Sequence, residues 1–167
     1  MHSYLEQLRR ELDEATGGAD TGALRQPTKG KWTPAQITEH LLLTYKGTNA
    51  GLAKCLAAAA PLAREITLKD RVGILLVVDL GYLPNGRKAP ERTIPRGLPF
   101  QEARMAMFSE LEKMALGLDD CERRFGARTR ILDHPILGPL TANQWRKFHL
   151  VHGHHHVRQI RERIGAS

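Results

Sequence analysis

Cysteine, aromatic residues and long hydrophobic runs are all scarce in this chain of 167 residues. Its two cysteines, Cys55 and Cys121, lack Cys-x-x-Cys spacing and fall inside expected helices, so we interpret them as buried thiols in a reducing cytoplasm. No apolar stretch approaches the roughly 20 residues needed to cross a bilayer, and residues 1–4 do not begin a signal peptide. The sequence therefore predicts a cytoplasmic protein without a membrane partner.

The chain is basic, with a formal net charge of +7, and this charge raises the question of nucleic-acid binding. However, the basic residues are spread along the chain, and acidic residues interrupt most of their runs. There is no zinc-finger or RNP pattern, and aromatic residues, at 5% of the chain, are too few to form a platform for stacking bases. We therefore interpret the charge as a solvated basic surface and do not expect nucleic acid as a partner.

Hydrophobic periodicity predicts five helices, over residues 3–15, 34–59, 70–82, 100–125 and from 142 onward. One run, Ile74–Val78, is rich in β-branched residues and has the composition of a buried strand. Because we find no second run of this kind to pair with it, we expect a helix there. The length and the lack of an interdomain linker predict a single domain over residues 1–167.

Two of these helices begin with a strong start signal. Thr33 and Thr141 are each followed three residues later by glutamine, which is the pattern of a capping box. Since a capping box fixes where a helix begins, the faces of both helices can be assigned. On the last helix His152 and His156 lie one turn apart at the edge of the apolar stripe, so their rings point the same way. The neighbouring histidines at 154 and 155 project away from that stripe.

His40 lies on the inward face of the other capped helix. Neutral imidazole is the commonest metal ligand in proteins. His40, His152 and His156 together make a three-nitrogen site that leaves coordination positions open. Such open positions are typical of catalytic rather than structural metals.

These residues form two ordered patterns, W-[ST]-x-x-Q-x-x-x-H-L and H-x-x-x-H-x-x-Q. The pair resembles the DinB/YfiT-like superfamily of metal-binding four-helix bundles. The matching residues are Trp32, Thr33, Gln36, His40, Leu41, His152, His156 and Gln159. In addition, residues 134–141 resemble an uncharacterised branch in which a His-Pro-x-x-Gly turn precedes the final helix. The resemblance covers about residues 30–165.

The resemblance implies an all-α, up-down-down-up four-helix bundle over residues 32–165, preceded by an additional N-terminal helix and loop over residues 1–31. It also implies that His40, His152 and His156 bind zinc, nickel or another divalent ion. Some members resemble thiol-dependent transferases or isomerases, and others resemble hydrolases. The leading hypothesis is thus a metal-dependent enzyme acting on a small molecule or a low-molecular-weight thiol. The alternative is a non-catalytic metal- or ligand-binding module with a structural or regulatory role. A homodimer is compatible with either.

Two further histidines are candidates for catalysis. His149 lies one turn before His152, where it can act as a pocket residue, a replacement ligand or a general base. His134 precedes a proline, so its ring either locks a turn or borders the mouth of a pocket. We expect the site to open at the end of the bundle where both capped helices begin, with the His134 turn beside it.

The basic, proline-rich stretch 84–99 is long for a connecting loop. It is either a plain surface loop or a lid whose Arg87 and Arg92 hold a carboxylate or phosphate of a thiol cofactor.

Three further expectations concern the helices over residues 34–59 and 70–82. Glu39 lies about 100° around the helix from His40, so we expect it to face solvent. We expect Asp79 to have a capping or surface role, the alternative being to orient a ligand histidine or bind the metal. The small residues Thr44, Gly47 and Gly51 are expected on the inward side, either for close helix packing or to leave room for a substrate.

Overall fold

The structure, a computed structural model, describes residues 2–17, 30–83 and 88–165. The long helices are α1 (Ser3–Gly17), α2 (Pro34–Ala57), α4 (Phe100–Phe125) and α5 (Ala142–Ile164). The shorter elements are α3 (Leu68–Ile74), the π-helical turn η2 (Leu75–Asp79), the 3-10 turn η3 (Glu91–Thr93) and the strands β1 (Arg130–His134) and β2 (Gly138–Thr141). The predicted mainly helical fold is confirmed, and the run Ile74–Val78 is helical as expected. No described helix has the length and apolarity required for a membrane span.

Both predicted capping boxes are present. The backbone N–H of Gln36 donates to the Thr33 hydroxyl oxygen, and the N–H of Thr33 donates to the Gln36 side-chain oxygen. Thr141 and Gln144 exchange the same two hydrogen bonds at the start of α5. Each box satisfies two backbone donors that a helix start would otherwise leave unpaired. The register of both histidine-bearing helices is therefore fixed from their first turn.

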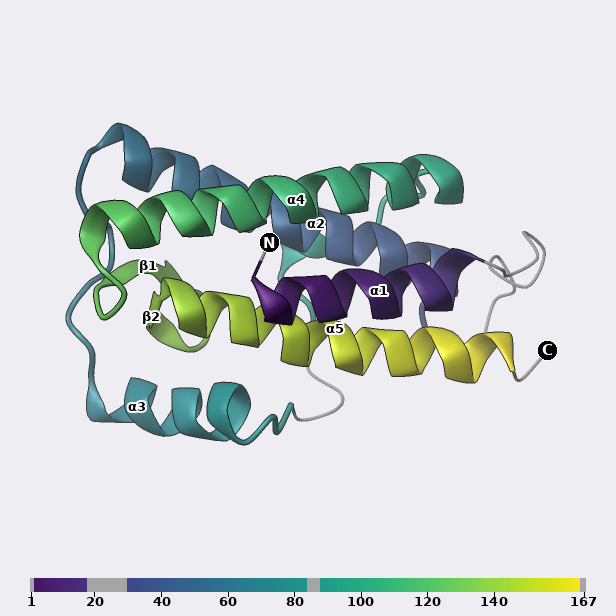
Figure 1. Ribbon diagram of the computed structural model, residues 1–167. Coiled ribbons are helices and arrows are strands. Elements are labelled where there is room, and N and C mark those ends of the chain that lie inside the picture. Colours follow the sequence, from purple (N-terminus) through teal and green to yellow (C-terminus); the bar gives the residue numbers. More distant parts are fainter. Residues whose placement is uncertain (1, 18–29, 84–87, 166–167) are drawn as a thin grey trace.

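The four long helices, which we call the bundle, pack side by side around one apolar core. In Figure 1, α1 and α5 run from left to right, whereas α2 and α4 run from right to left, which is the expected up-down-down-up order. α1 is not the additional helix that the resemblance implies, because its leucines are fully buried in the core. The additional element is instead α3 with η2, which lies outside the bundle beside α5.

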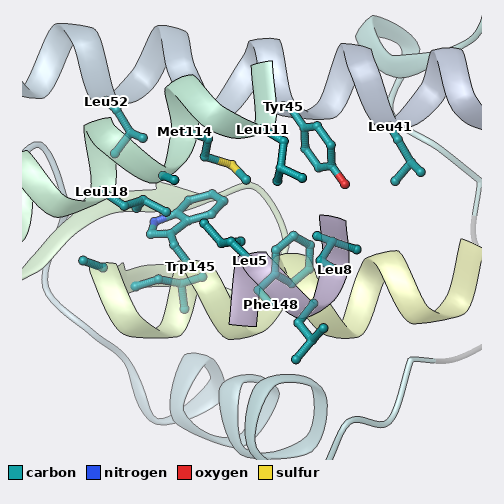
Figure 2. Packing of buried hydrophobic residues seen from close by; sticks show 14 of the residues in the cluster. Leu5, Leu8, Leu41, Tyr45, Leu52, Leu111, Met114, Leu118, Trp145 and Phe148 are labelled. Carbon is teal, nitrogen blue, oxygen red and sulfur yellow. The ribbon is translucent and has the colours of Figure 1, made fainter. Parts of the chain in front are cut away.

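The core draws on all four long helices. Figure 2 shows the inward side chains that fill it: Leu5, Leu8, Leu41, Tyr45, Leu52, Leu111, Met114, Leu118, Trp145 and Phe148. Cys55 and Cys121 are buried free thiols in the same core, as expected. Burial raises the pKa of Cys121 to about 12, which keeps this thiol protonated.

A β-hairpin before α5 was not predicted. β1 and β2 pair antiparallel, with Leu132 opposite Leu140 and His134 opposite Gly138. The His134 Nδ1 atom accepts hydrogen bonds from the backbone N–H groups of Ile136 and Leu137, so its ring locks the turn. This is one of the two roles that the sequence allowed for His134.

Two glycines allow close packing between elements: one between the hairpin and α2, the other between α1 and α5. A Cβ at Gly51 would lie 2.4 Å from a methyl of Leu132, so this glycine admits the hairpin against α2. Gly47, one turn earlier, is exposed and has open space around its Cβ position, so its expected place on the inward side is wrong. On α5, a Cβ at Gly153 would lie 2.1 Å from a methyl of the fully buried Leu8.

We predict opposite effects of alanine at Gly153 and Gly47. Gly153→Ala should destabilise the protein by about 1–3 kcal/mol, because α1 must move away to admit the new methyl group. Gly47→Ala is the matched control and should stabilise it by up to about 1 kcal/mol, since alanine favours a helix interior. Urea unfolding followed by circular dichroism, with a chelator present, measures both. Equal stability of the two variants would contradict this packing.

Candidate metal centre

Three histidines from two helices meet at one point. One ring nitrogen from each of His40, His152 and His156 lies within 4.8 Å of the other two. The Nε2 atoms of His152 and His156 are 3.1 Å apart. The centroid of the His40 ring lies 5.5 Å from that of His152 and 4.9 Å from that of His156. The structure thus brings together the three residues that the sequence had selected as ligands.

The directions of α2 and α5 explain where the cluster lies. Thr48 on α2 contacts His149, whereas His40, eight residues earlier, packs against His152 and His156. Residue numbers rise on one helix as they fall on the other, so the two helices are antiparallel. The cluster therefore lies in the first half of α2 and around the middle of α5. The expected opening at a shared starting end is wrong, because the two helices start at opposite ends of the bundle.

Hydrogen bonds fix the tautomer of two of the three rings. The Nδ1–H of His40 donates to the backbone carbonyl of Thr93, at 2.8 Å. The Nδ1–H of His156 donates to the side-chain oxygen of Gln159, at 2.9 Å. In both rings the proton is held at Nδ1, which leaves a lone pair on Nε2. Such outer partners are typical of metal-ligating histidines, because they orient the ring and raise its basicity.

Burial keeps these rings neutral. It lowers the pKa of His40, takes that of His156 to about 3, and holds that of His152 well below its ordinary value, with repulsion between the rings adding to the effect. A neutral imidazole with a free lone pair is the form that binds a cation. The site therefore needs no deprotonation at neutral pH before it can act as a ligand set.

The residues present fit a divalent metal ion. Two nitrogens that are each about 2.1 Å from one ion lie about 3.0–3.4 Å apart, which agrees with the contact between His152 and His156. With Nδ1 of His156 as a donor, its Nε2 can only accept. Nδ1 of His152 is buried and has no hydrogen-bond partner among the described residues. Without an ion, Nε2 of His152 can donate its proton to Nε2 of His156, and a cation shared by the three Nε2 atoms would take the place of that proton.

The loop before α4 is fastened beside this cluster by Glu39. The carboxylate of Glu39 accepts hydrogen bonds from the backbone N–H groups of Arg96, Gly97 and Leu98, at 2.8, 2.9 and 3.0 Å. Glu39 is only 4% exposed, so the expectation that it faces solvent is wrong. The helical period gives the direction of the Glu39 side chain relative to His40 correctly. It does not show that the loop covers the helix in that direction.

The same loop supplies the carbonyl that holds His40. Thr93 belongs to the turn η3, and its carbonyl oxygen contacts His40 while Glu39 holds the residues that follow. The described part of the loop therefore packs against α2 at the cluster. Of the two basic residues expected to bind an anion, Arg92 is exposed beside Thr93. Arg87 lies outside the described residues.

His149 and His134 lie near the cluster but are not part of it. His149 is fully buried, with its Nε2 3.2 Å from the Thr48 hydroxyl and its ring stacked on Trp145, and burial lowers its pKa to about 3. The centroid of the His134 ring lies 4.3 Å from that of Phe148, which in turn stacks on His152. Burial, aided by the charge of Arg92, lowers the pKa of His134 to about 4.

Asp79 has the expected surface role. Its carboxylate is about half exposed and lies 3.7 Å from the Lys147 ammonium group. It is not part of the histidine cluster.

The fold and the cluster together define a helical bundle with a three-histidine centre. A family model described as the DinB superfamily matches residues 4–160. The chain belongs to the DinB superfamily, and the resemblance seen in its sequence is confirmed. No curated protein and no solved structure matches it.

We predict that Glu39 supports metal binding without being a ligand. Glu39→Ala removes the acceptor for three loop N–H groups, so the Thr93 carbonyl should no longer hold the His40 ring. Loss of such an outer contact weakens metal binding by about 10- to 100-fold. Competition titration with Zn²⁺ and a coloured chelator measures the change. Glu112→Ala, at a half-exposed position on α4, is the control and should bind like the unaltered protein. Unchanged affinity in the Glu39 variant would show that the loop does not position His40.

Proposed function

We propose that this protein is a metal-dependent enzyme that holds a divalent ion, zinc or nickel, on the Nε2 atoms of His40, His152 and His156. In this proposal it transfers a low-molecular-weight thiol to a small electrophilic molecule. The observation that carries the proposal is the convergence of three neutral imidazoles, two of which have their tautomers fixed by hydrogen bonds at Nδ1.

The number of ligands favours a catalytic over a structural ion. Structural zinc sites have four protein ligands, whereas catalytic sites have three and keep a position for water or substrate. Among the described residues, no fourth histidine, cysteine or carboxylate belongs to the cluster. This set also lacks a carboxylate that could act as a general base, unlike the His-Glu-x-x-His proteases. Thiol transfer is therefore favoured over hydrolysis.

The charge of the site favours an anionic ligand. Three neutral imidazoles leave the charge of a divalent ion uncompensated. Arg163 repels a proton on His156, and Arg92 does the same to His134, so the surroundings are positive as well. A thiolate is an anion and a soft ligand that suits zinc. When bound, the ion supplies Lewis acidity and lowers the pKa of a thiol or water that coordinates it.

The side chains around the centre then have separate tasks. Trp32 and Phe148, whose ring centroids lie 5.0 Å from His40 and 5.5 Å from His152, exclude water from the ligand rings. Thr93 and Gln159 hold the rings in place, and Arg92 offers a guanidinium to a carboxylate or phosphate on the thiol. In the transfer the thiolate sulfur bonds to an electrophilic carbon, and the leaving group departs with the electron pair of the broken bond.

We predict that metal content depends on three histidines and not on their neighbours. His40→Ala, His152→Ala and His156→Ala should each abolish stoichiometric zinc or nickel while leaving the helical circular dichroism intact. His154→Ala is the matched control, since His154 contacts Glu11 on α1 at 2.9 Å, and it should retain full metal. Elemental analysis of protein purified without a histidine tag measures this. Full metal in the His152 variant would contradict the assignment.

We predict that the metal-loaded protein consumes a thiol and that Arg92 recognises its anionic group. A panel of small thiols with an electrophilic dye should give turnover that stops when a chelator removes the metal. Arg92→Ala should raise the KM for a carboxylate-bearing thiol by about tenfold, the value of one charge-assisted hydrogen bond, without changing metal content.

Two controls make this test specific. The KM for 2-mercaptoethanol, which has no carboxylate, should not change in the Arg92 variant. Arg123→Ala, at a surface ion pair on α4, should leave all kinetics unchanged. Stoichiometric metal without any thiol turnover would instead support the non-catalytic module.

A further inference from the structure

Gln159 contacts two histidines, one at each end of its amide group. Its side-chain oxygen accepts from the Nδ1–H of His156, at 2.9 Å. Its side-chain nitrogen lies 2.9 Å from Nε2 of His155. Within an amide group the nitrogen can only donate and the oxygen can only accept. The two rings must therefore make opposite contacts, with His156 donating from Nδ1 and His155 accepting at Nε2.

These contacts link the tautomers of the two rings. A neutral imidazole has one proton, so a contact that fixes one of its nitrogens also fixes the other. Because His155 accepts at Nε2, its proton is on Nδ1. Because His156 donates from Nδ1, its Nε2 has no proton and presents a lone pair to the cluster. Gln159 thus joins the state of a ring outside the cluster to the state of a ligand ring.

The amide of Gln159 has a second orientation that would close the centre to metal. The two ends of a glutamine amide are nearly equal in shape, so hydrogen-bond partners determine which way it points. Turned end for end, the amide would present N–H to Nδ1 of His156 and oxygen to Nε2 of His155. The proton of His156 would then be on Nε2, the atom that contacts His152. An Nε2 atom that carries a proton cannot bind a metal ion.

His155 lies where it can select between these two orientations. It is half-buried on α5, and it is not one of the three clustered histidines. The centroid of its ring lies 5.2 Å from that of His156. An acceptor at this place favours the orientation of Gln159 that leaves Nε2 of His156 free. A donor at the same place favours the reverse orientation.

We propose that His155 is a positioning residue of the metal centre, which acts through Gln159 to set which nitrogen of His156 carries the proton. Its bearing on metal affinity rests on the proposed function. The place of the proton on His156 does not, because it is a property of the protein before any ion binds.

A permanent donor at position 155 tests the link. The ammonium group of His155→Lys can only donate, so the Gln159 amide should turn and the proton of His156 should move from Nδ1 to Nε2. Nitrogen-15 NMR of the histidine rings reports this in the metal-free protein, at about pH 8, well above the ordinary histidine pKa of about 6.5. His154→Lys adds the same charge at an exposed neighbour and is the matched control. It should leave the proton on Nδ1.

The same two variants should differ in metal affinity. His155→Lys should weaken Zn²⁺ binding by about 10- to 100-fold, as the loss of an outer partner of a ligand histidine does. His154→Lys should bind nearly like the unaltered protein, because solvent and salt screen an exposed charge. Competition titration with a coloured chelator measures both.

Gln159→Glu provides the rescue. Both oxygens of a carboxylate accept, so neither orientation can present a donor to His156. Adding His155→Lys to the Gln159→Glu variant should therefore change neither the proton on His156 nor the Zn²⁺ affinity. A proton that stays on Nδ1 in His155→Lys, or an equal loss of affinity with and without Gln159→Glu, would overturn the proposal. If the proton moves as expected but the unaltered protein binds no metal, the proposed function fails and the positioning of His156 by His155 stands.

Discussion

Two hydrogen bonds donated by Nδ1–H groups determine what the centre of this protein can bind. Through them Nδ1 of His40 is tied to the Thr93 carbonyl, and Nδ1 of His156 is tied to Gln159. Both acceptors hold the proton on the outer nitrogen, so the inner nitrogens of His40 and His156 each present a lone pair to the cluster. Burial lowers the pKa of both rings, so they stay neutral. These two lone pairs meet a third ring nitrogen, that of His152, and one cation can be shared among all three, which is why the cluster is suited to metal.

The rest of the fold keeps that arrangement in place. α2 and α5 run antiparallel, and His40 on α2 lies against His152 and His156 on α5. The loop before α4 supplies the Thr93 carbonyl, and Glu39 fastens this loop through three backbone N–H groups. Gly153 lets α1 pack closely on the turn of α5 that carries His152 and His156. Each of these contacts limits where an imidazole can lie.

The three histidines could be predicted because capping chemistry is local and because the family pattern selects His152 and His156 over His149. Thr33 and Thr141 fix the first turn of each helix, and the helical period then places every side chain on a face. The role of Glu39 could not be predicted in this way, because the partners of its carboxylate lie 57 to 59 residues further along the chain. A helical wheel gives the direction of a side chain but not what covers it.

Features that depend on long-range packing were also missed. The antiparallel course of α2 and α5 follows from the path of the whole chain and not from either capping box. The hairpin has strands of five and four residues, too short for a clear alternating pattern, and β2 contains a proline. The resemblance begins near residue 30 and so leaves α1 outside the expected bundle, although the three leucines of α1 complete the core.

X-ray absorption at the zinc edge tests the central claim most directly. For the protein loaded with one equivalent of Zn²⁺ and purified without a tag, the account predicts a first shell containing three imidazole nitrogens at about 2.0–2.1 Å. The remaining ligand should be a light atom that is replaced by sulfur when a small thiol is added. A spectrum with one imidazole or none, or one that His40→Ala does not change, would contradict the account.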